Sequence, residues 1–237
     1  MCGRAKLPDD VSEIKLDLRI DFDEIGEYRP HWNAAPTSKL PVVVSCNGRR
    51  TLTLMRWGLI PSWADDIKIG RASFNARAES IDNRPVFRGA WKAGRRCLAI
   101  TDGYYEWRDT DKQPFAVALG NRGPMTFAAI WDSWRAPDGS ILKSFAIVTT
   151  SANELLQPLH DRMPVLIAPH LWPSWLGETP TSDAALKAML RPYPGEAMTF
   201  WPVDRRVGNV RNNSADLFAP LTDSAEFGSE NLIGIRD

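Results

Sequence analysis

The sequence is poor in cysteine and histidine, with three of each among 237 residues. The cysteines Cys2, Cys46 and Cys97 lie far apart, and no two of them have the C-x-x-C spacing of a zinc or redox site. We therefore expect no disulfide framework, no metal centre and no cofactor.

The sequence also lacks a net charge and a long apolar run. Its 29 basic residues balance 29 acidic ones, so bulk charge gives no argument for a polyanionic partner, and any nucleic-acid site must be a local patch. No stretch approaches the ~20 apolar residues of a membrane span, and no secretory signal is recognisable at the N-terminus. We expect a cytoplasmic, reducing location without membrane contact.

The sequence has an ordinary globular composition, with 43% hydrophobic residues, and its pattern predicts many short elements. Apolar periodicity predicts strands at residues 41–46, 51–57, 97–101, 104–108, 115–119, 125–131, 145–150 and 165–168. It predicts helices at 11–20, 152–157, 171–176 and 183–190. Asn47-Gly48 is the strongest hairpin signal. We expect one mixed α+β domain over residues 2–221, mainly of antiparallel strands, followed by a polar tail at 222–237.

The N-terminal string Met1-Cys2-Gly3-Arg4 is the most informative part of the chain. Removal of Met1 would leave Cys2 with a free α-amine beside its thiol. Because such groups titrate at about 7.7–8.0 and about 8.5, both are expected to have a usable nucleophilic fraction at neutral pH. The alternative is that Cys2 is a small apolar residue in a buried first strand.

Two further segments combine aromatic or basic side chains with turn-forming residues. One is the loop Trp57-Gly58-Leu59-Ile60-Pro61-Ser62-Trp63. It could present flat rings to nucleic-acid bases, or its side chains could pack into the core. Asn75-Ala76-Arg77-Ala78-Glu79, followed by Arg84 and Arg88, offers an amide that can orient a substrate and guanidinium groups that can hold phosphates. Solvated surface arginines are the alternative.

Two candidate proton-transfer residues come later. Glu106 lies among large aromatics, where burial would raise its pKa, and strand alternation places it on the face of Tyr104, opposite Tyr105 and Trp107. His160 lies in His160-Asp161-Arg162-Met163-Pro164 beside a charged residue. An exposed Glu on a half-buried strand and a loop histidine bonded to backbone are the alternatives.

Together these segments resemble the SRAP family, the SOS-response-associated peptidases that shield abasic sites in DNA. The resemblance rests on the N-terminal string, the loop at 57–61, the Asn75 segment, Gly103-Tyr104-Tyr105-Glu106-Trp107 and the His160 segment, and it continues through Pro202-Val203 and Val207-Gly208-Asn209-Val210. It extends over roughly residues 2 to 220 in the same order.

The resemblance implies an antiparallel β-barrel-like core surrounded by helices, and a groove for single-stranded DNA that leads to mature Cys2. It implies that the Cys2 amine and thiol form a thiazolidine with the aldehyde of an abasic site, assisted by Asn75, Glu106 and His160. It also implies a DNA-contact set and a monomer that associates with the nucleoid on damage. That contact set comprises Arg4, Trp57, Pro61, Arg77, Arg84, Trp107 and Thr149.

Two rival functions stay open on the sequence. One is an N-terminal-nucleophile amidohydrolase, whose amine would act as base while the thiol attacks an amide. Its Asn-Gly-Glu segment is absent, since the only Asn-Gly is the hairpin turn Asn47-Gly48. The other is a non-covalent single-strand-binding module in which Cys2 is only structural.

Overall fold

The computed structural model describes residues 2–221. Its strands are β1 (Ala5–Lys6), β2 (Phe22–Asp23), β3 (Lys39–Cys46), β4 (Arg49–Trp57), β5 (Asn75–Arg77), β6 (Arg96–Thr101), β7 (Gly103–Trp107), β8 (Pro114–Leu119), β9 (Met125–Arg135), β10 (Ile141–Ser151), β11 (Arg162–Pro164) and β12 (Met198–Pro202). Its α-helices are α1 (Ser12–Asp17), α2 (Pro85–Lys92), α3 (Trp172–Leu176) and α4 (Asp183–Ala188). Short 3-10 turns connect several of them.

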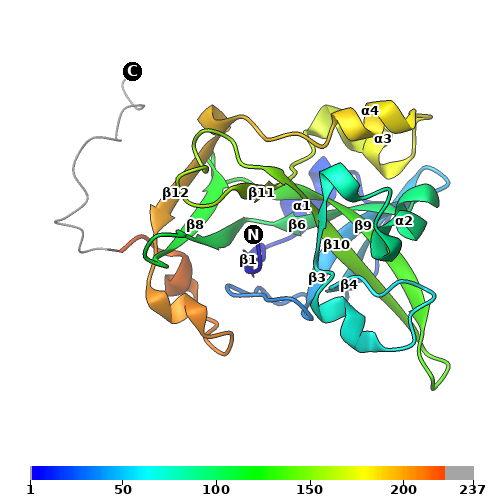
Figure 1. Ribbon diagram of the computed structural model, residues 1–237, viewed down its shortest axis with the longest axis horizontal. Helices are drawn as coiled ribbons and strands as arrows, with labels where there is room; N and C mark the ends of the chain where they lie inside the picture. The colour runs from blue at the N-terminus through cyan, green and yellow to red at the C-terminus, as the bar shows by residue number, and fades with distance from the viewer. Residues whose placement is uncertain (1, 222–237) are drawn as a thin grey trace.

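A closed, mixed β-barrel forms the centre of the molecule (Figure 1). The strands follow one another in the order β10, β9, β6, β3 and β4, with antiparallel neighbours throughout. A parallel pairing of β4 with β10, Arg56 opposite Ser144 and Trp57 opposite Phe145, closes the ring. The prediction of a mainly antiparallel, barrel-like α+β fold is confirmed.

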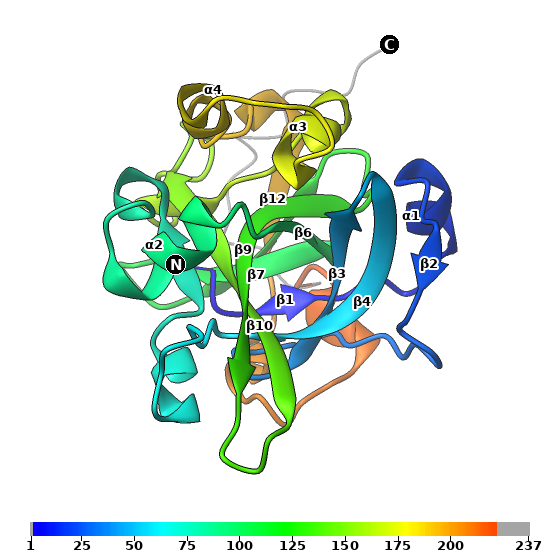
Figure 2. The same cartoon turned by 90° about the vertical axis from the view of Figure 1, so that its right-hand side faces the viewer.

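A second sheet stands beside the barrel and carries the start of the chain. Its strand order is β1-β7-β8-β12, and Ala5 of β1 lies opposite Tyr104 of β7. Ala5 also forms a bridge with Ala34, so β1 is held from both sides. In Figures 1 and 2, β1 forms the edge of the second sheet that lies next to the barrel strands.

Alternation along the barrel strands divides the buried side chains into two large clusters. In β6, Leu98 and Ile100 join a cluster that includes residues of all four α-helices. Cys97 and Ala99 point the other way, into a cluster that contains Cys2 and residues of β1, β7 and β8. The N-terminal residues are therefore part of the packed interior and not a free end.

Local sequence signals predicted some of these elements correctly and missed others. The Asn47-Gly48 hairpin is confirmed, because both residues adopt the left-handed backbone that a two-residue turn requires, with φ of 52° and 73°. The predicted helix at 11–20 is present but shorter, as α1. Helix α2 was not predicted; Pro85 begins it, and Phe87, Ala90 and Trp91 form its buried face.

Two sequence predictions around His160 are wrong. Residues 152–157 form turns instead of a helix, because the helical bond from Gln157 to Asn153 is not continued by Pro158, which has no N–H. The predicted strand at 165–168 is reduced to a single bridge, Leu166 opposite Phe127, and the ladder with β10 lies earlier in the chain, at β11 (Arg162–Pro164).

No helix in the described residues is long and apolar enough to cross a membrane. The predicted polar tail at 222–237 lies outside those residues, so the boundary after residue 221 stays a prediction.

Candidate active site

Cys2 lies just before β1 and has no exposed surface. It packs in the cluster between the barrel and the second sheet, and the backbone N–H of Arg4 donates a hydrogen bond to its sulfur. Burial alone fits the alternative reading of Cys2 as a packing residue. The polar neighbours of Cys2 distinguish a packing residue from a reactive one.

The Cys2 thiol does not have the ordinary acidity that the sequence suggested. Burial raises its pKa well above the usual range, and the negative charge of Glu106 raises it further. Burial therefore acts against the usable thiolate fraction that the sequence predicts for Cys2 at neutral pH. In this environment the sulfur is a neutral thiol.

Asn75 connects the barrel to residue 2. Its side-chain nitrogen donates to the backbone oxygen of Cys2 over 2.7 Å. Strand β5 holds Asn75 in place through parallel pairing with β10, where it lies opposite Ile147. Its Oδ1 is buried and, within the described part of the chain, accepts no hydrogen bond.

Glu106 lies on β7 and is 5% exposed. It shares a face with Tyr104, which packs in the Cys2 cluster, while Tyr105 belongs to a separate cluster on the other face, as alternation predicted. Burial raises the pKa of Glu106, and the charge of the neighbouring His160 acts in the opposite direction. The prediction of a carboxyl with a raised pKa is confirmed.

His160 approaches from the loop between β10 and β11. Leu156 and Leu159 anchor this loop in the Cys2 cluster, and the oxygen of Leu159 accepts from the N–H of Asp109 beyond β7. The Nδ1 atom of His160 accepts from the N–H of Arg162 over 3.0 Å and lies 2.7 Å from a carboxylate oxygen of Asp161. A neutral imidazole bonded in this way carries its proton on Nε2, and the imidazolium can donate to Asp161.

Arg4 does not present a free guanidinium to a ligand. Its Nη1 donates to Asn33 Oδ1 over 2.8 Å and to the oxygen of Val207 over 2.5 Å, while Nη2 donates to the oxygen of Gly208 over 3.0 Å. The predicted phosphate contact by Arg4 would have to compete with these three bonds.

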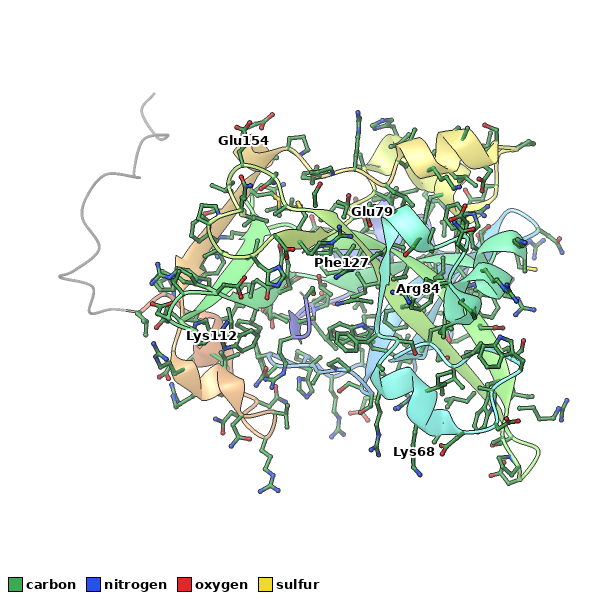
Figure 3. All side chains as sticks on the ribbon, viewed as in Figure 1. Lys68, Glu79, Arg84, Lys112, Phe127 and Glu154 are labelled. Carbon is green, nitrogen blue, oxygen red and sulfur yellow. The ribbon has the colours of Figure 1, made fainter. Side chains whose placement is uncertain are left out.

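Arg77 and Arg84 fit the predicted phosphate role better. Both side chains are exposed, and neither forms a hydrogen bond or close ion pair within residues 2–221. Arg77 is at the end of β5, two residues after Asn75. Figure 3 shows Arg84 and Glu79 on the segment that leads from β5 to α2.

Three predicted DNA contacts do not fit the positions of their side chains. Trp57 and Thr149 have no exposed surface, and Pro61 is buried. A buried ring cannot stack on a base. Trp57 instead donates from its indole nitrogen to the oxygen of Phe74, which supports the start of β5 and thus Asn75. The backbone oxygen of Thr149 accepts from Arg162 over 2.7 Å.

The exposed aromatic of the same loop is Trp63, at 58% exposure. Asp132 fixes this loop by accepting from the N–H of Ser62, and the Trp134 indole donates to the oxygen of Ala64. Trp107, another predicted DNA contact, is half-buried. The Arg4 guanidinium carbon lies over its ring, 5.8 Å from the ring centre. An alternating aromatic loop does not reveal from sequence which ring points outward.

The fold thus brings all four predicted catalytic residues to one place. Cys2, Asn75, Glu106 and His160 come from the N-terminus, β5, β7 and the β10–β11 loop. A buried carboxyl with a raised pKa and an imidazole are groups that general acid–base catalysis uses, and an amide can orient the main chain of residue 2. In the described residues no three His, Cys, Asp or Glu side chains gather as metal ligands.

The sequence model of the SOS response associated peptidase (SRAP) family matches residues 1–210. The chain belongs to the SRAP family. Solved structures show the same fold: a Bacteroides thetaiotaomicron protein matches with a TM-score of 0.83 at 21% identity, covering 93% of this chain and 100% of that one.

Two named SRAP relatives span most of the chain. The abasic site processing protein YoqW of Bacillus subtilis is 36% identical over 221 residues, covering 92% of this chain and 98% of YoqW. The abasic site processing protein HMCES of Xenopus tropicalis is 31% identical over 268 residues, covering 93% of this chain and 78% of HMCES.

Proposed function

We propose that this protein processes abasic sites in single-stranded DNA by forming a covalent thiazolidine between Cys2 and the ring-opened sugar. Two relatives bear the name abasic site processing protein, which supports the choice of substrate. The observation that carries the chemistry is the convergence of a buried carboxyl, an imidazole and a carboxamide on the second residue of the chain.

The reaction begins after hydrolysis of the Met1–Cys2 peptide bond, which consumes one water and releases the Cys2 α-amine. The amine attacks the aldehyde carbon, and loss of one water gives an imine. The thiol then adds to the imine carbon and its proton ends on the nitrogen, closing a five-membered ring. No oxidant or reductant is involved, and closure is favourable because both nucleophiles belong to one residue.

The raised pKa of the Cys2 thiol explains the order of these reaction steps. A neutral thiol does not compete for the aldehyde, so the amine reacts first, and the sulfur reacts only with the more electrophilic imine carbon. Glu106 donates the proton that leaves with water and accepts it again on reversal. His160 assists proton transfer at the sugar oxygen. Asn75 holds the main chain of residue 2.

We assign the DNA contacts to exposed residues. Arg77 and Arg84 hold phosphates, and Trp63 stacks on a base, a role that buried Trp57 cannot take. The peptidase activity in the family name corresponds in this proposal to removal of Met1, and the lyase-like activity to handling of the sugar. We further propose that the protein works as a cytoplasmic monomer, where its thiol stays reduced.

Incubation with abasic and intact single strands, followed by denaturing electrophoresis, tests this function. We expect a heat-stable protein–DNA band on the abasic strand alone, absent in Cys2→Ala. Salt-sensitive binding of both strands without a band would contradict the proposal and favour a non-covalent module. Ammonia release from glutamine would instead identify an amidohydrolase.

A further inference from the structure

The segment of residues 203–213, here named the C-terminal clamp, folds over the N-terminal residues although it is about two hundred positions away. Its anchor is Asn33, which is 1% exposed. The Asn33 side-chain nitrogen lies 3.0–3.1 Å from the backbone oxygens of Val207, Asn209 and Asn212. One buried amide thus gathers three carbonyl groups of the clamp.

Arg4 completes this arrangement from the N-terminal side. Its guanidinium spans Asn33 Oδ1 and the oxygens of Val207 and Gly208. The fork geometry of a guanidinium suits several carbonyl acceptors at once, which a lysine ammonium cannot reproduce. Two of the five Arg4 donors are therefore taken up by the clamp and a third by Asn33.

The backbone of Arg4 contacts the site directly. Its N–H donates to the Cys2 sulfur, and its oxygen accepts from the N–H of Tyr105, the residue before Glu106. The first residues of a chain are poorly ordered unless they are tied down, and β1 contains only Ala5 and Lys6. Arg4 therefore adds an anchor for position 2 to those that β1 and Asn75 provide.

We propose that Arg4 is a positioning residue, which the C-terminal clamp and Asn33 lock in place so that its backbone fixes Cys2, and that it is not a phosphate ligand. The kinetic part of this inference rests on the proposed function. Arg77 provides the contrast, since its exposed side chain forms no hydrogen bond within the described residues. A positioning defect should appear in rate, and a lost phosphate contact in affinity and salt dependence.

The variants Arg4→Lys, Arg4→Gln, Asn33→Ala and Arg77→Gln separate these roles. At saturating abasic DNA, we expect the first three to slow crosslinking about 10- to 100-fold. Their affinity for single strands with a tetrahydrofuran abasic analogue should stay within about twofold, with an unchanged salt slope. Arg77→Gln should weaken that affinity and reduce the slope by about one. Crosslinking by Arg4→Lys at the wild-type rate, with a reduced slope in Arg4→Gln, would overturn the proposal.

A DNA-free measurement keeps the clamp testable on its own. Iodoacetamide labelling of Cys2, located by peptide mass spectrometry, should be slow in the wild-type chain and at least about tenfold faster in Arg4→Gln and Asn33→Ala, because the sulfur is fully buried. Unchanged labelling would contradict the clamp. If wild-type protein forms no crosslink, the proposed function fails, yet this labelling comparison still decides the clamp.

A milder variant addresses the risk that Asn33→Ala does not fold. Asn213→Ala removes only the acceptor for the N–H of Trp32, at the exposed end of the clamp. We expect a folded protein with a smaller increase in Cys2 labelling, and no increase would count against the clamp.

Discussion

The side-chain nitrogen of Asn75 lies 2.7 Å from the backbone oxygen of Cys2. This bond joins a barrel-associated strand to the first residues of the chain. The other end of the same amide, Oδ1, is buried and accepts no hydrogen bond in the described residues. A buried acceptor without a donor is costly, so this atom suits an N–H or O–H that arrives with mature Cys2 or with substrate.

Asn75→Asp and Asn75→Ala test both ends of this amide. Asp loses the donor to Cys2 and Ala loses both groups, so we expect crosslinking rates at saturating DNA to fall about tenfold or more in each. Single-turnover kinetics measure the effect. Rates equal to wild type in both variants would show that Asn75 does not orient residue 2.

Glu106→Gln should change stability in a pH-dependent way. Because burial raises the folded-state pKa, the carboxyl favours the fold while protonated, and this contribution is lost as pH rises through the folded-state value. The variant should therefore match wild type below the unfolded-state pKa of about 4.3 and become the more stable protein at higher pH.

Urea unfolding at about pH 4 and pH 8 measures this difference. Glu154→Gln, which changes an exposed carboxylate (Figure 3), is the control and should show no such pH dependence. An advantage of Glu106→Gln that is equal at both pH values would contradict the raised pKa.

The two tryptophans of one loop should behave oppositely. Trp57→Ala should lower the free energy of unfolding by about 3–5 kcal/mol, because the ring is fully buried. Trp63→Ala should leave stability within about 0.5 kcal/mol and weaken single-strand binding by about 1–3 kcal/mol. Thermal unfolding and fluorescence anisotropy distinguish the pair, and the reverse pattern would contradict the assignment of Trp63 as the stacking residue.

Gly58 permits the close packing that shapes this loop. It has a φ of +121°, and an added Cβ would lie 2.3 Å from the backbone oxygen of Gly70. Gly58→Ala should destabilise the protein by more than the ~1 kcal/mol of an ordinary strained glycine position. Gly26→Ala is the matched control, since its φ is +62° and nothing lies within 4 Å of the added atom. Equal losses would show that the Gly58–Gly70 contact is unimportant.

Sequence patterns predicted the elements that have local causes. The hairpin at Asn47-Gly48 follows from two residues that tolerate positive φ, and the Glu106 face follows from strand alternation. Strand β12 was missed, and so was β1, because a two-residue strand is defined by its partner in the sheet. Propensity alone carries no such information.

The residues of the candidate site also differ in whether their roles have local causes or depend on distant partners. Residue types identified Cys2, Asn75, Glu106 and His160, whose chemistry is readable from sequence and resemblance. The roles of Arg4 and Trp57 were not readable, because each depends on a distant backbone oxygen, that of Val207 or Phe74. Only the folded chain reveals that one guanidinium is already engaged and one indole faces inward.

Mass spectrometry of the protease- and nuclease-digested crosslink identifies the bond that Cys2 forms most directly. We expect an adduct on the N-terminal Cys2 peptide without Met1, with the mass of peptide plus sugar fragment minus one water. The adduct should resist both borohydride reduction and thiol alkylation, as a thiazolidine does and an open imine does not. An adduct that retains Met1, lies on another residue or keeps a free Cys2 thiol would contradict thiazolidine formation at Cys2.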